Sequence, residues 1–114
     1  MLAKQHRLPV DGFSSRARRL PKGEIILAKT APNELGFLRV GILASRKHVK
    51  KASARNALKR TVFDYFSPLK TGLKSGVDLL IIVATPIIKF DSQTKDDLLR
   101  DLELVKASLF STTR

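Results

Sequence analysis

The sequence lacks cysteine and tryptophan, and its 114 residues include one methionine and one tyrosine. Without cysteine the chain has no disulfide framework and no thiolate zinc site. Its longest apolar run, LLIIVA, is far too short to cross a bilayer. The first residues, MLAKQHRLPV, lack the apolar core of a signal peptide. We therefore expect a cytoplasmic protein that forms a single domain over residues 1–114.

Negative charge is scarce in the first part of the chain. From Leu35 to Phe63 there are eight Lys or Arg and no Asp or Glu. Residues 1–63 hold 15 basic and 3 acidic side chains, whereas residues 64–114 hold seven of each, so the first part carries the whole net charge of +12. Such a one-sided field favours a polyanion, with nucleic acid first and an anionic membrane second. A surface that serves solubility alone usually mixes both signs.

Familiar catalytic motifs are missing as well. The chain has no HExxH, no GxSxG and no phosphate-binding glycine loop. His6 and His48 lie in basic stretches, where we expect them at the surface or facing phosphate. Asp97 and Asp101 are spaced as metal-binding carboxylates sometimes are, but the Lys and Arg around them indicate a solvated helix face. The residues therefore predict no catalytic side chain and no metal ligand in this chain.

Hydrophobic periodicity and turn residues predict six elements. They are a short helix within 10–19, strands over 24–30 and 37–45 that form a hairpin, a helix over 53–66, a buried strand over 77–85 and a helix over 92–110. The order α-β-β-α-β-α predicts an α+β fold, a sandwich of helices on a sheet. Ser53 and Ser92 are the expected helix N-caps.

Both long helices have an apolar stripe that we expect in the core. The predicted core positions are Ala54, Leu58, Val62 and Tyr65 in the first helix, and Leu98, Leu102, Val105 and Leu109 in the last. The other side of the first helix is almost purely cationic, with Phe63 in its middle. Stacking of Phe63 on an RNA base and burial against the N-terminal segment are equally compatible with the pattern.

The densest basic stretch is SRKHVKKASARNALKR, residues 45–60. Lys and Arg on one helical face meet successive phosphates along a groove, and Arg holds a phosphate through two parallel hydrogen bonds. Asn56 adds a side chain that donates and accepts at a sugar hydroxyl or a base edge. A merely solvated helix would interleave Glu at i±4, and none is present. The stretch therefore predicts a nucleic-acid-binding surface.

The longer stretch LRVGILASRKHVKKASARNALKR resembles the signature of the bacterial ribonuclease P protein family. The family has a strand with RVG, a Ser/Ala-Lys-Lys turn and a helix that opens with RNRxKR. Here the matching residues are Arg39-Val40-Gly41, Ser45-Arg46-Lys47 and residues 55–60. The opening His6-Arg7-Leu8, followed by Phe13, is also similar. Two positions depart from the pattern, because Ala57 and Phe63 stand where the family has Arg.

The resemblance implies a left-handed strand-helix-strand crossover and a role in the ribonucleoprotein endoribonuclease that removes the 5′ leader from precursor tRNA. The catalytic RNA of that enzyme carries the chemistry, with magnesium held mainly by the RNA and the substrate. The implied partners are this RNA and precursor tRNA, with no membrane and no obligate protein partner. Contacts with the catalytic RNA are implied for Arg46, Lys47, Arg55, Asn56, Lys59 and Arg60, with Lys50 and Lys51 as additions. Leader contacts are implied for Phe13 and Arg39.

Three other functions remain open from the residues. A ribosomal or other structural RNA-binding protein shares the size and charge but has no effect on precursor-tRNA cleavage. An autonomous metal-dependent nuclease needs clustered carboxylates near the basic face, and most carboxylates of this chain lie in the other half. A binder of anionic membranes needs a wide apolar helix face, and the stripe here is modest.

Overall fold

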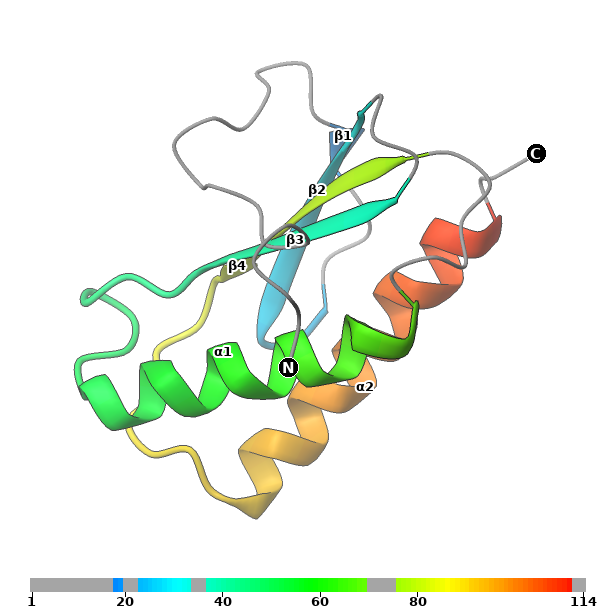
Figure 1. Cartoon of the computed structure of the whole chain (residues 1–114). Coiled ribbons are helices and arrows are strands. Elements are labelled where there is room, and N and C mark those ends of the chain that lie inside the picture. Colours follow the sequence, from blue (N-terminus) through cyan, green and yellow to red (C-terminus); the bar gives the residue numbers. More distant parts are fainter. Residues whose placement is uncertain (1–17, 20–22, 34–36, 70–75, 112–114) are drawn as a thin grey trace.

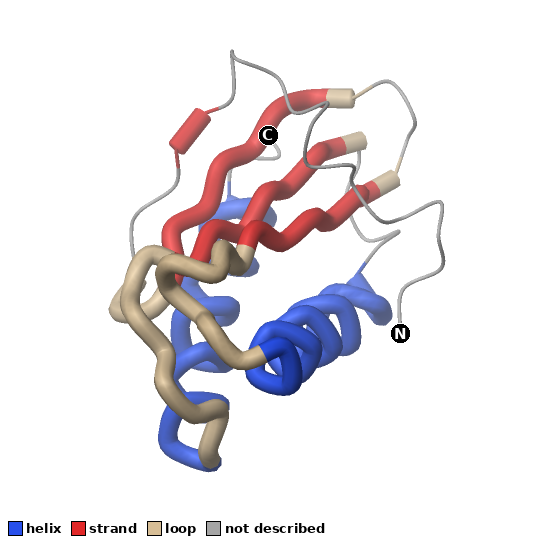
Figure 2. The backbone as a smooth tube through the Cα atoms, turned by 90° about the vertical axis from the view of Figure 1, so that its left-hand side faces the viewer, coloured by secondary structure: helices blue, strands red, loops and turns tan. Residues whose placement is uncertain are grey.

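The computed structural model describes residues 18–19, 23–33, 37–69 and 76–111. Its elements are β1 (Arg18–Arg19), β2 (Ile26–Pro32), β3 (Leu38–Leu43), α1 (Ala52–Phe66), the 3-10 turn η3 (Ser67–Leu69), β4 (Val77–Val83) and α2 (Ser92–Ser111). The two helices lie on one side of a mixed sheet (Figure 1; Figure 2), which confirms the α+β class. Most of the helix predicted within 10–19 lies outside the described residues. Its last two residues form β1, so that part of the prediction was wrong.

The sheet has the order β1-β2-β4-β3. β4 lies between β2 and β3, antiparallel to the first and parallel to the second, so the predicted β2–β3 hairpin was wrong. The physical reason is that β4 is apolar on both faces, with Leu79, Leu80 and Ile81 all buried, and a central place shields such a strand best. Parallel strands require a crossover, which α1 provides between β3 and β4. The handedness of this crossover stays a prediction.

The core forms between the sheet and the two helices. Ala28, Ile81 and Ile42 are register partners across β2, β4 and β3, and all three belong to the buried core. The predicted helix stripes are confirmed except at Tyr65, which is only partly buried and donates a 2.6 Å hydrogen bond to Glu103. The buried helix positions are Ala54, Leu58 and Val62 of α1 and Leu98, Leu102, Val105 and Leu109 of α2.

Phe63 also belongs to this core. Its side chain is 9% exposed, so it contributes packing and is not available for stacking on an RNA base. The structure therefore supports burial of Phe63 over stacking on a base, while the N-terminal segment named in that prediction lies outside the described residues. The polar face of α1 is therefore one residue narrower than the sequence predicted.

The N-cap residues differ from the prediction by one or two positions, although α2 begins at Ser92 as predicted. α1 begins at Ala52 with Lys51 in the N-cap position, where no side chain caps the helix, so Ser53 is not the cap. α2 is capped by Asp91, whose Oδ1 accepts a 2.9 Å hydrogen bond from the Thr94 N–H, so Ser92 is the first helical residue. This bond lowers the pKa of Asp91.

Asp101 ties α2 to the start of β2. Its carboxylate is 2% exposed and accepts hydrogen bonds from the backbone N–H groups of Glu24 (3.0 Å), Ile25 (2.7 Å) and Ile26 (3.2 Å). The prediction of a solvated face was therefore wrong for this residue. A Cβ added at Gly23 would overlap the same carboxylate, so glycine lets the backbone approach it closely.

We expect Asp101→Asn to lower the free energy of unfolding by about 2–3 kcal/mol, because an amide offers one acceptor oxygen and turns an N–H toward backbone donors. Urea unfolding measures this change. Asp97→Asn, one turn earlier on α2, is the matched control and should change the free energy by less than about 0.5 kcal/mol, since the described partners of Asp97 are Gln93 and Arg100 near the surface. Equal midpoints for the two variants would contradict the role assigned to Asp101.

Candidate RNA interface

The loop between β3 and α1 is held in a fixed shape. The N–H groups of His48 and Val49 both donate to the Ser45 carbonyl, at 3.1 and 2.8 Å. Ser45 Oγ and His48 Nδ1 are hydrogen-bonded at 3.1 Å, and the Val49 side chain is fully buried. The turn is therefore anchored in the core beneath the charged side chains that it displays.

Arg55 fastens the first turn of α1 to this loop. One nitrogen of its guanidinium group donates to the carbonyl oxygens of Val49 (2.8 Å) and Lys50 (3.0 Å). The side chain is half-buried as a result. Arg55 thus positions the segment from which Lys50 and Lys51 extend, while its direct contact with RNA stays a prediction.

The other predicted RNA contacts are exposed and lie on the same loop and the helix that follows it (Figure 1). We call this set the cationic surface: Arg46, Lys47, Lys50, Lys51, Asn56, Lys59 and Arg60. The ion pairs found among the described residues, Arg39–Asp78 and Arg100–Asp97, lie elsewhere. The first turn of α1 also has no acidic residue. The described part of the chain therefore leaves this positive charge largely uncompensated, as a polyanion-binding surface requires.

Of the two predicted leader contacts, the structure describes only Arg39, which does not join the cationic surface. Phe13 lies outside the described residues. Arg39 is on β3, where its neighbours Leu38 and Val40 face the helices, so Arg39 lies on the opposite side of the sheet. Its guanidinium group holds Asp78 through two hydrogen bonds of 2.8 Å.

The Arg39–Asp78 pair includes a third side chain, because Asn33 Nδ2 donates to Asp78 at 2.7 Å. Burial on its own raises the pKa of Asp78, but the hydrogen bonds from Arg39 and Asn33 and the Arg39 charge outweigh it. The net effect lowers the pKa of Asp78 below its ordinary value. The hydrogen bond to Asp78 correspondingly raises the pKa of Arg39.

The sequence did not identify the loop between β4 and α2 as a neighbour of the cationic surface. The Ile87 N–H donates a 2.8 Å hydrogen bond to the His48 carbonyl and so joins the two loops. Ile87 is buried, whereas Ile88 and Lys89 are exposed. The only signal in the sequence is the pair of isoleucines after Pro86, which continues the apolar run beyond the end of the strand.

Two properties of the described residues bear on a metal-dependent or a membrane-spanning function. Among the described residues, no group of three or more His, Cys, Asp or Glu is placed to hold a metal ion. Within the same part of the chain, none of the helices has the length and apolar character needed to cross a membrane.

A small α+β fold with an uncompensated cationic surface defines a candidate RNA-binding protein. The family model for ribonuclease P matches residues 13–107, and the chain belongs to this family. A ribonuclease P protein component from Aromatoleum aromaticum is 37% identical over 79 residues, which are 68% of this chain and 66% of the relative. One from Chromohalobacter salexigens is 37% identical over 73 residues, or 64% of this chain and 55% of the relative. The matches thus span less than two thirds of these relatives.

Solved structures show the same fold. A mutant RNase P protein from Staphylococcus aureus, described as defective in mRNA degradation activity, superposes with a TM-score of 0.70 at 21% identity over 90% of each chain. The RNase P protein from Thermotoga maritima superposes with a TM-score of 0.60 at 24% identity over 94% of each chain. The likeness of these structures extends over nearly the whole chain.

We expect the Arg39–Asp78 ion pair to stabilise the folded protein by an amount that depends on pH. Because the folded pKa of Asp78 is lowered, the contribution is present above the unfolded pKa of about 4 and is lost as the pH falls through the folded value. We expect Asp78→Asn to destabilise the protein by roughly 1–3 kcal/mol at pH 7, and the difference from wild type to shrink below about pH 4. Denaturant unfolding at both pH values measures this, with the exposed Asp96→Asn as control. A difference that does not change with pH would contradict the role assigned to the Arg39–Asp78 pair.

Proposed function

We propose that this protein is the cytoplasmic protein subunit of ribonuclease P. In this role it binds the catalytic RNA and assists the removal of the 5′ leader from precursor tRNA. The observation that carries the proposal is the cationic surface, whose exposed cations have no carboxylate partner among the described ion pairs. Because the chain belongs to the ribonuclease P family, we take the bound RNA to be the catalytic RNA of that enzyme.

The surface suits an RNA backbone in both charge and geometry. Arg46 and Arg60 offer planar forks that hold a phosphate through two hydrogen bonds, whereas the lysines act as point charges. Asn56 adds a group for a sugar hydroxyl or a base edge. Because the loop is already fixed by Val49 and Arg55, little ordering is needed when RNA binds. The positive field also screens the repulsion between the catalytic RNA and its RNA substrate.

Magnesium belongs to the RNA in this proposal. The described carboxylates do not form a metal site. The Asp101 carboxylate already accepts hydrogen bonds from backbone N–H groups, and the Asp78 carboxylate already accepts hydrogen bonds from Arg39 and Asn33. The described residues therefore do not fit a protein-held ion, and we assign metal binding and bond cleavage to the RNA and the substrate.

The two departures from the family pattern have different consequences. Phe63 is part of the core, so the position adds nothing to the RNA contact. Ala57 is half-buried and leaves the outer side of α1 with one cation fewer. More of the RNA contact therefore falls to Lys50 and Lys51 in the preceding loop.

The leader-binding role of Phe13 and Arg39 stays a prediction of the resemblance. The pairing of Arg39 with Asp78 does not support it, because the guanidinium fork that would hold a phosphate is already occupied. A ribosomal or other structural RNA-binding role is the alternative, and the family match does not favour it.

We expect the protein to restore accurate 5′ cleavage of a precursor tRNA by a ribonuclease P RNA at low magnesium. The variant Lys59→Ala/Arg60→Ala should weaken binding to the catalytic RNA roughly tenfold. It should also reduce the slope of log K against log salt by about 1.4–1.8, as expected for the loss of two phosphate contacts. Filter binding over a salt series and single-turnover cleavage measure these effects.

The matched control is Lys95→Ala/Arg100→Ala, which removes the same charge from exposed positions on α2. It should leave the salt slope and the cleavage rate near their wild-type values. Equal losses in the two double variants would mean that only net charge matters. Tight RNA binding without any stimulation of cleavage would support the alternative of a structural RNA-binding protein.

A further inference from the structure

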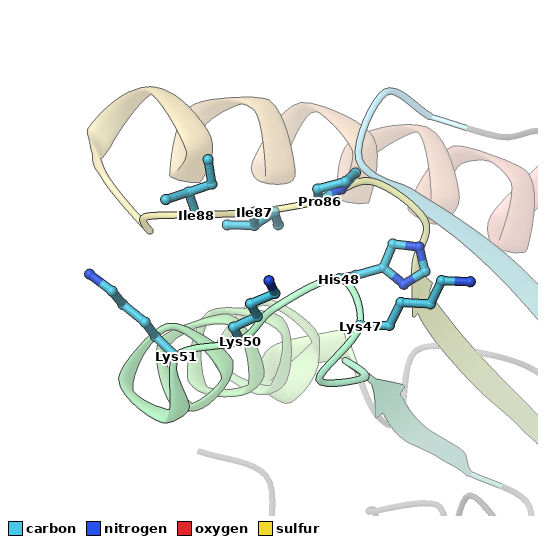
Figure 3. A pocket seen from close by; sticks show the side chains of 7 residues that line it. All are labelled: Lys47, His48, Lys50, Lys51, Pro86, Ile87 and Ile88. Carbon is cyan, nitrogen blue, oxygen red and sulfur yellow. The ribbon is translucent and has the colours of Figure 1, made fainter.

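A cavity of about 440 Å³ lies between the loop before α1 and the loop after β4 (Figure 3). Its size is within the range of about 300–1,000 Å³ that is typical of small-ligand pockets. One side is cationic and the other is apolar. The lining residues are Lys47, His48, Lys50 and Lys51 on the first loop, and Pro86, Ile87 and Ile88 on the second.

Both walls of the cavity are anchored in the fold. The hydrogen bond from the Ile87 N–H to the His48 carbonyl joins them at 2.8 Å. The side chain of Ile87 is 7% exposed, and Val49 next to His48 is fully buried. In Figure 3 the side chains of Lys50 and Lys51 extend from the start of α1 toward the opposite loop. The cavity is therefore formed by two loops that are packed into the core and hydrogen-bonded to each other.

The chemistry of the lining is unusual for a plain surface depression. Ile88 is 82% exposed beside three lysines, and no carboxylate is among the described residues that line the cavity. A single exposed apolar side chain is ordinary on a protein surface. An apolar wall that faces several uncompensated cations fits a ligand with a flat apolar part and an attached anion.

An unpaired nucleotide has this chemistry. Its base offers a flat face to apolar side chains, and its phosphates carry the negative charge. A paired base is stacked inside a duplex and does not reach such a pocket. The cavity shares Lys47, Lys50 and Lys51 with the cationic surface, so the RNA that binds this surface also passes the mouth of the cavity.

We propose that this cavity receives one unpaired nucleotide of the catalytic RNA, with its base against Pro86 and Ile88 and its flanking phosphates on Lys47, Lys50 and Lys51. The inference rests on the proposed function and extends the RNA contact to the loop between β4 and α2. Ile88 thereby contributes affinity for a base, whereas the lysines contribute affinity for the backbone.

The test is Ile88→Ser in the assembled ribonucleoprotein, with chemical probing of the base edges of the catalytic RNA. Wild-type protein should protect at least one unpaired base, and Ile88→Ser should restore its reactivity. The variant should weaken binding roughly three- to tenfold without changing the salt slope, because no charge is removed. Leu104→Ser is the matched control, since Leu104 is an apolar residue of α2 that is 53% exposed. Thermal unfolding should be unchanged in both variants.

The outcomes separate the pocket from the proposed function. If Ile88→Ser matches wild type in base protection and affinity while all three proteins stimulate cleavage, the pocket assignment is overturned and the proposed function stands. If the variant weakens only the binding of precursor tRNA that carries a leader, the assignment to the catalytic RNA is wrong. A wild-type protein that neither binds the catalytic RNA nor stimulates cleavage overturns both proposals.

Discussion

The position of β4 in the middle of the sheet is the constraint on which the rest of the structure depends. β4 pairs with β2 along one edge and with β3 along the other, and it buries apolar side chains on both faces. Since β3 and β4 are parallel, the chain must cross the sheet between them, and α1 makes this crossing. Once Leu58 and Val62 face the core, Lys59 and Arg60 must face outward. The location of the cationic surface thus follows from strand pairing.

The cationic surface combines rigid support with positive charge that the described residues leave largely uncompensated. Val49 is buried below it, Arg55 holds the backbone of the loop, and Ile87 joins it to the neighbouring loop. Exposed like charges repel one another and lower the stability of a folded chain. Such an arrangement is useful when a polyanion neutralises the charge, and the fixed backbone then presents the cations in a defined pattern. The packing of the loops thus supports the proposed binding of RNA.

The sequence predicted features that depend on near neighbours and missed those that depend on distant ones. The helix stripes and the cationic run follow from local spacing, and apart from the partly buried Tyr65 the structure places them where the periodicity predicts. The pairing of β4 with β2 and β3, the Arg39–Asp78 pair and the burial of Asp101 depend on partners at least 39 residues away. The burial of Phe63 could not be predicted from α1 alone. A residue between the apolar and the polar face of a helix becomes buried only when other elements cover it. The cavity beside Ile88 likewise needs two loops that the sequence does not connect.

Lysine acetylation with and without the catalytic RNA tests the central claim most directly, because it reports which face of the protein the RNA covers. The account predicts that RNA lowers the modification rates of Lys47, Lys50, Lys51 and Lys59 several-fold, while Lys95 on α2 keeps its rate. All of these side chains are exposed in the structure. Protection of Lys95, with the other four lysines still reactive, would contradict the assignment of the RNA to the cationic surface.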